Sequence, residues 1–152
     1  MIVGARLGPF RTPRGTWTPE GPILDVRRTN PVKRWPRTFA GRLFIGFNVD
    51  RVPTWTIDHL SAFVEREWAG GASIIAQQGL WRDADAPAAE PREDSGQVVI
   101  LVEQGKPFAT VEDFAQAVIT LGEKAVTRFR QKSILFQIQD RGQEFDAGEI
   151  IP

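Results

Sequence analysis

Few side chains in this sequence are suited to acid–base, nucleophilic or metal chemistry. The chain of 152 residues has no cysteine and a single histidine, which excludes disulfides, thiolate metal sites and cysteine nucleophiles. His59 is therefore the one conventional general base near neutral pH, and it is the only candidate catalytic residue. No recognisable motif places a serine nucleophile beside it. A surface position next to a helix cap is the favoured interpretation of His59.

A polar and aromatic cluster at residues 77–83 offers a candidate ligand-binding site. An arginine beside a tryptophan, as at Trp81 and Arg82, can bind a carboxylate or phosphate through two hydrogen bonds. Together with Trp55 and His59, these residues would line a small-molecule pocket. The competing interpretation, which we favour, is that Trp81 packs for its own burial and Arg82 pairs with a nearby aspartate. No metal site and no cofactor are expected, because the acidic residues of the following loop lack the glycine of a calcium loop and no glycine-rich phosphate loop is present.

Hydrophobic periodicity predicts four strands and two helices. The strands are expected at residues 42–49, 72–81, 97–103 and 133–139. Each helix begins at a threonine that can cap it, Thr56 or Thr110, and continues as an apolar stripe at helical spacing. Each half of this region is therefore strand–helix–strand, and two such halves predict an α+β, ferredoxin-like split βαββαβ fold. Its four-stranded antiparallel sheet would carry both helices on one face.

Composition divides the chain into an extended, basic, Pro- and Gly-rich arm at residues 1–41, the α+β domain at residues 42–139 and an acidic tail at residues 140–152. The arm has eight basic and two acidic side chains, whereas the rest of the chain has 11 basic and 17 acidic ones. Because the formal net charge is zero, a dedicated nucleic-acid binder is disfavoured. The sequence shows no export signal and no apolar run long enough to cross a membrane. A bacterial, cytoplasmic protein without membrane association is expected.

The predicted sheet has one face that the helices leave open, and the functional prediction rests on this face. Phe44 points to this face, and the third strand has apolar residues on both of its faces. If nothing covered the open face, it would be an exposed hydrophobic patch that promotes association. Aromatic side chains of the arm, or the sheet of a second subunit, could cover it. We therefore predict a homodimer whose interface includes Phe44, Trp17 and Trp35. The predicted function is a non-catalytic binding or assembly domain that oligomerises through its sheet face.

Two other functions are compatible with the sequence. One is a small-molecule-binding protein or small enzyme with a pocket around Trp81, Arg82 and His59. The other is a nucleic-acid accessory protein that binds phosphates through the basic arm at residues 1–41, in a strongly salt-dependent manner. A protein partner other than a second copy would also fit the open face. The assembly domain is favoured over these alternatives, and a catalytic role is not favoured.

Short motifs in a fixed order resemble a family of small uncharacterised bacterial proteins. They are Leu43-Phe44-Ile45-Gly46, Trp55, Phe63, Gln78-Gly79-Leu80-Trp81-Arg82, Glu93-Asp94-Ser95 and Arg128-Phe129-Arg130-Gln131-Lys132-Ser133-Ile134-Leu135. The family shows a QGxWR strand end and an RFxQxSVL entry into the last strand, and the resemblance covers residues 42–138. It implies the βαββαβ fold and no particular activity.

Overall fold

The computed structural model describes residues 10–12, 15–17, 35, 37–80, 82, 84–88 and 90–152, the first two ranges by their backbone alone. The chain divides into two compact units, Met1–Arg34 and Trp35–Pro152, and each is described by itself. In the first unit, strands β1 (Phe10–Thr12) and β2 (Gly15–Trp17) pair as an antiparallel hairpin. The side chain of Trp17, an expected interface residue, lies outside the described part of the chain, as do most other residues of the arm.

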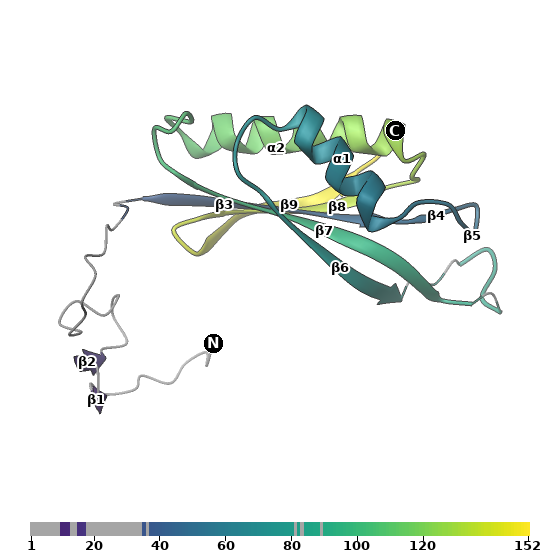
Figure 1. Ribbon diagram of the computed structural model, residues 1–152, viewed down its shortest axis with the longest axis horizontal. Coiled ribbons are helices and arrows are strands. Elements are labelled where there is room, and N and C mark those ends of the chain that lie inside the picture. The colour runs from purple at the N-terminus through teal and green to yellow at the C-terminus, as the bar shows by residue number, and fades with distance from the viewer. Residues whose placement is uncertain are drawn as a thin grey trace. The chain divides into compact units, whose positions relative to one another are not determined.

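The second unit is an α+β domain built on one antiparallel sheet and two helices. Its elements are, in chain order, β3 (Thr38–Gly46), β4 (Asn48–Val49), β5 (Val52–Pro53), α1 (Ile57–Glu67), β6 (Ser73–Leu80), β7 (Arg92–Glu103), α2 (Val111–Arg128), β8 (Ile134–Asp140) and β9 (Gln143–Ile150). The five long strands pair in the order β6-β7-β3-β8-β9, and β4 pairs with β5 as a separate short hairpin. Both helices lie on the same face of the five-stranded sheet (Figure 1). The predicted α+β class is therefore confirmed.

The sheet has five strands rather than the four predicted, because part of the expected acidic tail forms the edge strand β9. Arg141 and Gly142 have positive φ angles of 55° and 78° and make the two-residue turn between β8 and β9. Seven of the eight β9 residues are exposed, and only Ile150 is buried. The strand thus lacks the hydrophobic alternation by which a sequence reveals a strand. Its acidic side chains suit an edge, where charge discourages pairing with other chains.

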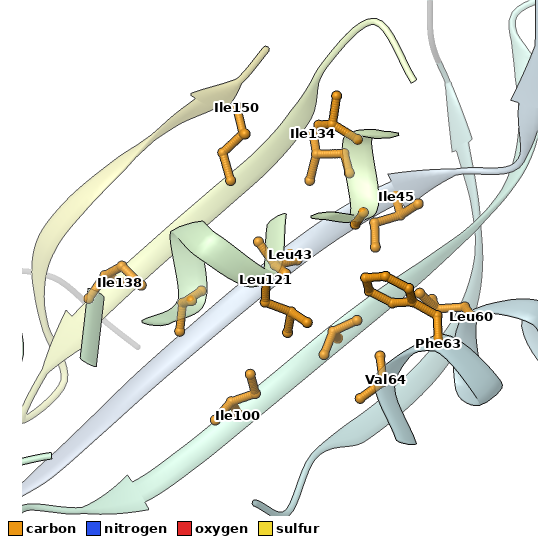
Figure 2. Packing of buried hydrophobic residues seen from close by; sticks show 14 of the residues in the cluster. Leu43, Ile45, Leu60, Phe63, Val64, Ile100, Leu121, Ile134, Ile138 and Ile150 are labelled. Atoms are coloured by element: carbon orange, nitrogen blue, oxygen red, sulfur yellow. The ribbon is translucent and has the colours of Figure 1, made fainter. Parts of the chain in front are cut away.

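The hydrophobic core fills the space between the helices and the face of the sheet that they cover. In Figure 2, Leu43 and Ile45 of β3 lie among Leu60 and Phe63 of α1 and Leu121 of α2. All five of these side chains are buried, and burying a large apolar side chain stabilises a fold by about 1.5–3 kcal/mol. This packing fixes which side chains of β3 and β7 point away from the helices, because alternate residues of a strand face opposite sides.

Both predicted helix caps form. The Thr110 hydroxyl accepts a hydrogen bond from Asp113 N at 3.1 Å at the start of α2. At the start of α1, His59 Nδ1 accepts from Thr56 N at 3.1 Å and lies 2.9 Å from the Thr56 hydroxyl. His59 thus completes a capping box, in which cap and third helical residue satisfy each other's backbone.

The opposite face of the sheet carries a mixture of polar and apolar side chains. Leu101 and Ile75 are 57% and 45% exposed there, and Phe44 is partly buried. Trp35, the other described residue of the expected interface, is 40% exposed. The homodimer stays a prediction. Neither α1 nor α2 has the length and apolar character that a membrane-crossing helix needs.

Candidate functional site

A cavity of about 480 Å³ lies where β3 runs into the β4–β5 hairpin, at the end of the domain labelled β4 and β5 in Figure 1. The β6–β7 loop and the turn between α2 and β8 complete its wall. The lining residues are Phe44, Gly46, Asn48, Asp50, Arg51, Arg82, Ala84, Glu90, Pro91, Arg92, Glu93, Arg130, Gln131, Lys132, Ser133 and Leu135. Five of these side chains are cationic and three are anionic. Phe44 and Leu135, paired across β3 and β8, add an apolar surface, so the cavity suits a ligand with charged and neutral parts.

Glu93 is a partly buried anionic residue of this cavity. It lies on β7 opposite Gly79 of β6, and strand alternation turns its side chain to the face without helices. Its Oε1 accepts a hydrogen bond from Asn48 N at 2.7 Å. Burial raises the pKa of the Glu93 carboxyl above its usual value, although hydrogen bonds from the backbone of Asn48 and Phe47 lower it in part. A carboxylate held partly out of water interacts more strongly with a cation than a solvated one does.

Gly46 gives the Glu93 carboxyl the room that it occupies. A β-carbon on Gly46 would lie 2.4 Å from Glu93 Oε1 and 2.9 Å from its Cδ, closer than van der Waals contact permits. Gly46 is the last residue of β3 and pairs with Ser95 of β7, so its backbone cannot retreat without disturbing the sheet. The close approach of the carboxyl therefore requires glycine here.

Gln131 reaches the cavity from the turn after α2. Its Nε2 donates to Asn48 O at 3.0 Å and to Phe129 O at 2.9 Å. Asn48 is thus held twice, through its carbonyl by Gln131 and through its N–H by Glu93. Three segments that are distant in the sequence, the β3–β4 junction, β7 and the α2–β8 turn, are fixed around one point by these bonds.

Backbone strain is concentrated at the rim of the cavity. Within the described part of the chain, the non-glycine residues with positive φ are Asp50 (49°), Arg51 (67°), Arg130 (51°) and Arg141 (55°). The first three of these line the cavity. Asp50 and Arg51 form the two-residue turn of the β4–β5 hairpin, where Asn or Gly is usual. Left-handed non-glycine residues cost about 1–3 kcal/mol each, so the surrounding fold must hold them in place.

Trp55 and His59 are not among the residues that line the cavity, although the Arg130 guanidinium of the lining lies 5.7 Å from the centre of the Trp55 ring. Trp55 Nε1 donates to Phe129 O at 2.9 Å, and the ring packs edge-on against the rings of Phe129 and His59. The Arg128 guanidinium lies 4.8 Å from the centre of the Trp55 ring. His59 is exposed and caps α1. Trp55 therefore connects the start of α1 to the end of α2, and His59 packs against Trp55 from the first turn of α1.

Of the residues predicted to bind a ligand, the structure brings Arg82 to the cavity. Trp81, its neighbour in the sequence, lies outside the described residues. Phe44, predicted for a subunit interface, lines the same cavity as Arg82.

Sequence reasoning misses Gly46, Glu93 and Gln131. Glu93 stands among the acidic and proline-containing residues that predict a solvated loop, and its burial depends on its position against Gly46. A signal is nevertheless present, because all three residues belong to motifs that carry the family resemblance, as do Phe44 and Arg82. Those motifs, taken only as markers of the fold, converge on the cavity.

No family model matches the sequence, and no curated protein matches it. Two similar solved structures are a phage SAM lyase in complex with S-methyl-5'-thioadenosine and a phage SAM lyase in the apo state. Each is 29% identical to this chain with a TM-score of 0.67, and the match covers 81% of this chain and 97% of that chain. The resemblance to the bacterial family stays a prediction.

The likeness to the lyase structures overturns the predicted non-catalytic assembly domain. Structural neighbours at this identity over nearly their whole length are an enzyme, which points to an enzymatic function. The prediction was wrong because it rested on the apolar side chains of the open sheet face. The charged groups of the cavity come together only in three dimensions, at one end of that sheet.

Proposed function

We propose that this chain is an enzyme that cleaves S-adenosylmethionine (SAM) and releases S-methyl-5'-thioadenosine. The observation that carries the proposal is the likeness to the phage SAM lyase, at 29% identity over 97% of that chain. The cavity of about 480 Å³ supports it, since pockets for small ligands of this size class have similar volumes. The strand order β6-β7-β3-β8 with both helices on one face supports a ferredoxin-like plan, to which β9 adds an edge strand.

The product determines which bond of SAM breaks. S-methyl-5'-thioadenosine keeps the methyl and adenosyl groups on sulfur, so the bond that breaks joins sulfur to the four-carbon amino acid. The electron pair of that bond stays on sulfur and neutralises the sulfonium. The four-carbon fragment then either accepts an electron pair from its own carboxylate, giving a lactone, or loses a proton from the neighbouring carbon, giving an alkene. Both routes balance without water.

The charged groups of the cavity complement those of SAM. Arg82 is the proposed partner of the substrate carboxylate, because a guanidinium can bind it through two hydrogen bonds. Phe44 and Leu135 offer an apolar surface for the adenine ring. Glu93 provides negative charge for the cationic part of the substrate. The sulfonium loses its charge as the bond breaks, so a carboxylate held against it would oppose the reaction. Glu93 is therefore proposed to bind and orient SAM through a cationic group that keeps its charge.

The test is to incubate the purified full chain with SAM and to follow the products by chromatography and NMR. We expect S-methyl-5'-thioadenosine together with a lactone or an alkene, whereas homoserine as the first product would indicate hydrolysis instead. Glu93→Gln and Arg82→Met are expected to lower kcat/KM by about tenfold or more, since each removes an interaction with a charged group. Glu65→Gln, on the exposed side of α1, is the matched control. A folded wild-type chain that leaves SAM intact would refute the proposal.

A further inference from the structure

Gln131 presents its amide oxygen to the cavity. The side-chain atom near Asn48 O and Phe129 O must be Nε2, at 3.0 Å and 2.9 Å, because a carbonyl can only accept a hydrogen bond. The amide oxygen therefore points away from both carbonyls. It accepts no hydrogen bond from any residue that the structure describes.

The amide oxygen of Gln131 and the carboxylate of Glu93 converge beside Gly46. The ideal β-carbon position of Gly46 lies 3.2 Å from Gln131 Oε1 and 2.4 Å from Glu93 Oε1. Both atoms are acceptors within hydrogen-bonding reach of the same region, so a single group with several donors placed there could serve both. The absence of a side chain on Gly46 keeps the space beside them open.

Glu93 also needs a positive charge. Five cationic side chains line the same cavity, yet Glu93 forms no ion pair within the part of the chain that the structure describes. A partly buried carboxylate without a cationic partner is unfavourable. A ligand that brings both a positive charge and several donors would satisfy the two oxygens together.

We propose that Gln131 and Glu93 form the subsite for the α-ammonium group of the substrate, an inference that rests on the proposed function. A primary ammonium has one positive charge and three donors, so it can donate to both oxygens and compensate the carboxylate. The sulfonium has no donor, and the adenine amino group has no charge. Gln131 is therefore a specificity residue: it distinguishes SAM from S-methyl-5'-thioadenosine, which has lost the ammonium group.

Two thioethers separate recognition of the ammonium from recognition of the carboxylate. One, 5'-S-(3-aminopropyl)-5'-thioadenosine, has the amine and no carboxylate; the other, 5'-S-(3-carboxypropyl)-5'-thioadenosine, has the carboxylate and no amine. In calorimetric titrations of the full chain, Gln131→Met is expected to weaken binding of the amine probe by about tenfold or more. Binding of the carboxylate probe and of S-methyl-5'-thioadenosine should not change.

A second variant separates recognition from a merely structural role. Gln131→Met loses the bonds to Asn48 O and Phe129 O. Gln131→Lys can still donate to these carbonyls, but it has no acceptor and brings its own positive charge close to Glu93. Gln131→Lys should therefore melt at or above the wild-type temperature and lose affinity for the amine probe. Equal weakening of both probes, or unchanged affinity of Gln131→Lys for the amine probe, would overturn the inference.

The inference and the proposed function can fail separately. If the amine probe binds in a Gln131-dependent manner but no S-methyl-5'-thioadenosine is released from SAM, the subsite stands and the proposed activity fails. If SAM is cleaved while the Gln131 variants bind both probes as the wild type does, the activity stands and the subsite fails.

Discussion

Replacing Gly46 with alanine perturbs the cavity at the point where its segments meet. The added β-carbon would lie 2.4 Å from Glu93 Oε1, so the carboxylate must retreat by about 1 Å to restore van der Waals contact. A displacement of that size breaks the 2.7 Å hydrogen bond from Asn48 N. A hydrogen bond to a charged group contributes about 1.5–3 kcal/mol. Loss of the oriented carboxylate is therefore expected to lower kcat/KM for SAM by about 10- to 150-fold.

The same substitution is expected to leave the fold intact. The clash involves the far end of a flexible side chain, which can turn toward the open side of the cavity. Alanine is also favoured over glycine within a strand by about 0.5–1 kcal/mol, which offsets part of the lost hydrogen bond. The free energy of unfolding from urea titration should therefore fall by no more than about 0.5–2.5 kcal/mol, too little to unfold the domain. Gly71→Ala is the control, because nothing lies within 4 Å of its ideal β-carbon.

The assay measures release of S-methyl-5'-thioadenosine over a range of SAM concentrations, beside the urea titration. A Gly46→Ala variant that cleaves SAM as the wild type does would show that the position of the Glu93 carboxylate does not matter for the reaction. A variant that loses activity only because it unfolds would show that Gly46 acts through the fold. The reasoning is supported if Gly46→Ala loses much of its activity while it stays folded, and if Gly71→Ala loses neither activity nor stability.

Four more outcomes follow from burial and hydrogen bonding. Because the pKa of Glu93 is raised above 4.5, SAM cleavage should increase as the pH rises through that pKa and the carboxylate forms, and the pH–rate profile of Glu93→Gln should lack this limb. The raised pKa also means that ionisation of Glu93 destabilises the fold. The contribution of Glu93 to the free energy of unfolding should therefore be greatest at pH values below its ordinary pKa, and it should decline as the pH rises through the pKa of Glu93 in the folded chain. Thr110→Ala removes the acceptor for Asp113 N and should lower the free energy of unfolding by about 1 kcal/mol, whereas Thr127→Ala, at an exposed position of α2, should not. Phe114→Ala, at a fully buried site, should lower it by about 3–5 kcal/mol in the same urea titration; a loss below 1 kcal/mol would mean that the α2–sheet packing is not as described.

The helices can be predicted from the sequence because their signals are local. Thr56 and Thr110 each precede a run of apolar residues at helical spacing, and both caps form in the structure. The strand β9 cannot be predicted in this way, since its pairing with β8 rather than its own pattern makes it a strand. The Arg141–Gly142 turn is its only local sign, and a two-residue turn alone does not distinguish a hairpin from a tail.

The candidate site lies beyond local sequence reasoning for a different reason. Arg82 is a candidate from the sequence alone, because an arginine beside a tryptophan suggests anion binding without reference to any other segment; the structure shows that it lines the cavity, and anion binding stays a prediction. Glu93 and Gln131 are held in place by Asn48, to which both are hydrogen bonded. The absence of a side chain on Gly46 leaves the space that the Glu93 carboxyl occupies. None of these contacts is implied by spacing along the chain, since the partners are brought together by the β3–β7 register and by the end of α2.

Two unfavourable contributions to the stability of this domain lie at the cavity. Asp140, at the far end of β8, has its pKa lowered by hydrogen bonding to Arg37, so its charge stabilises the fold. Glu93 is the described carboxylate whose pKa is raised, and its charge destabilises the empty fold. The strained turn at Asp50 and Arg51 lies on the same rim. A cation bound beside Glu93 reverses the sign of that contribution, and the ligand then stabilises the folded chain. If the chain cleaves SAM as proposed, part of the energy lost in building the empty cavity is recovered on binding, and this favours the cationic substrate over the neutral product.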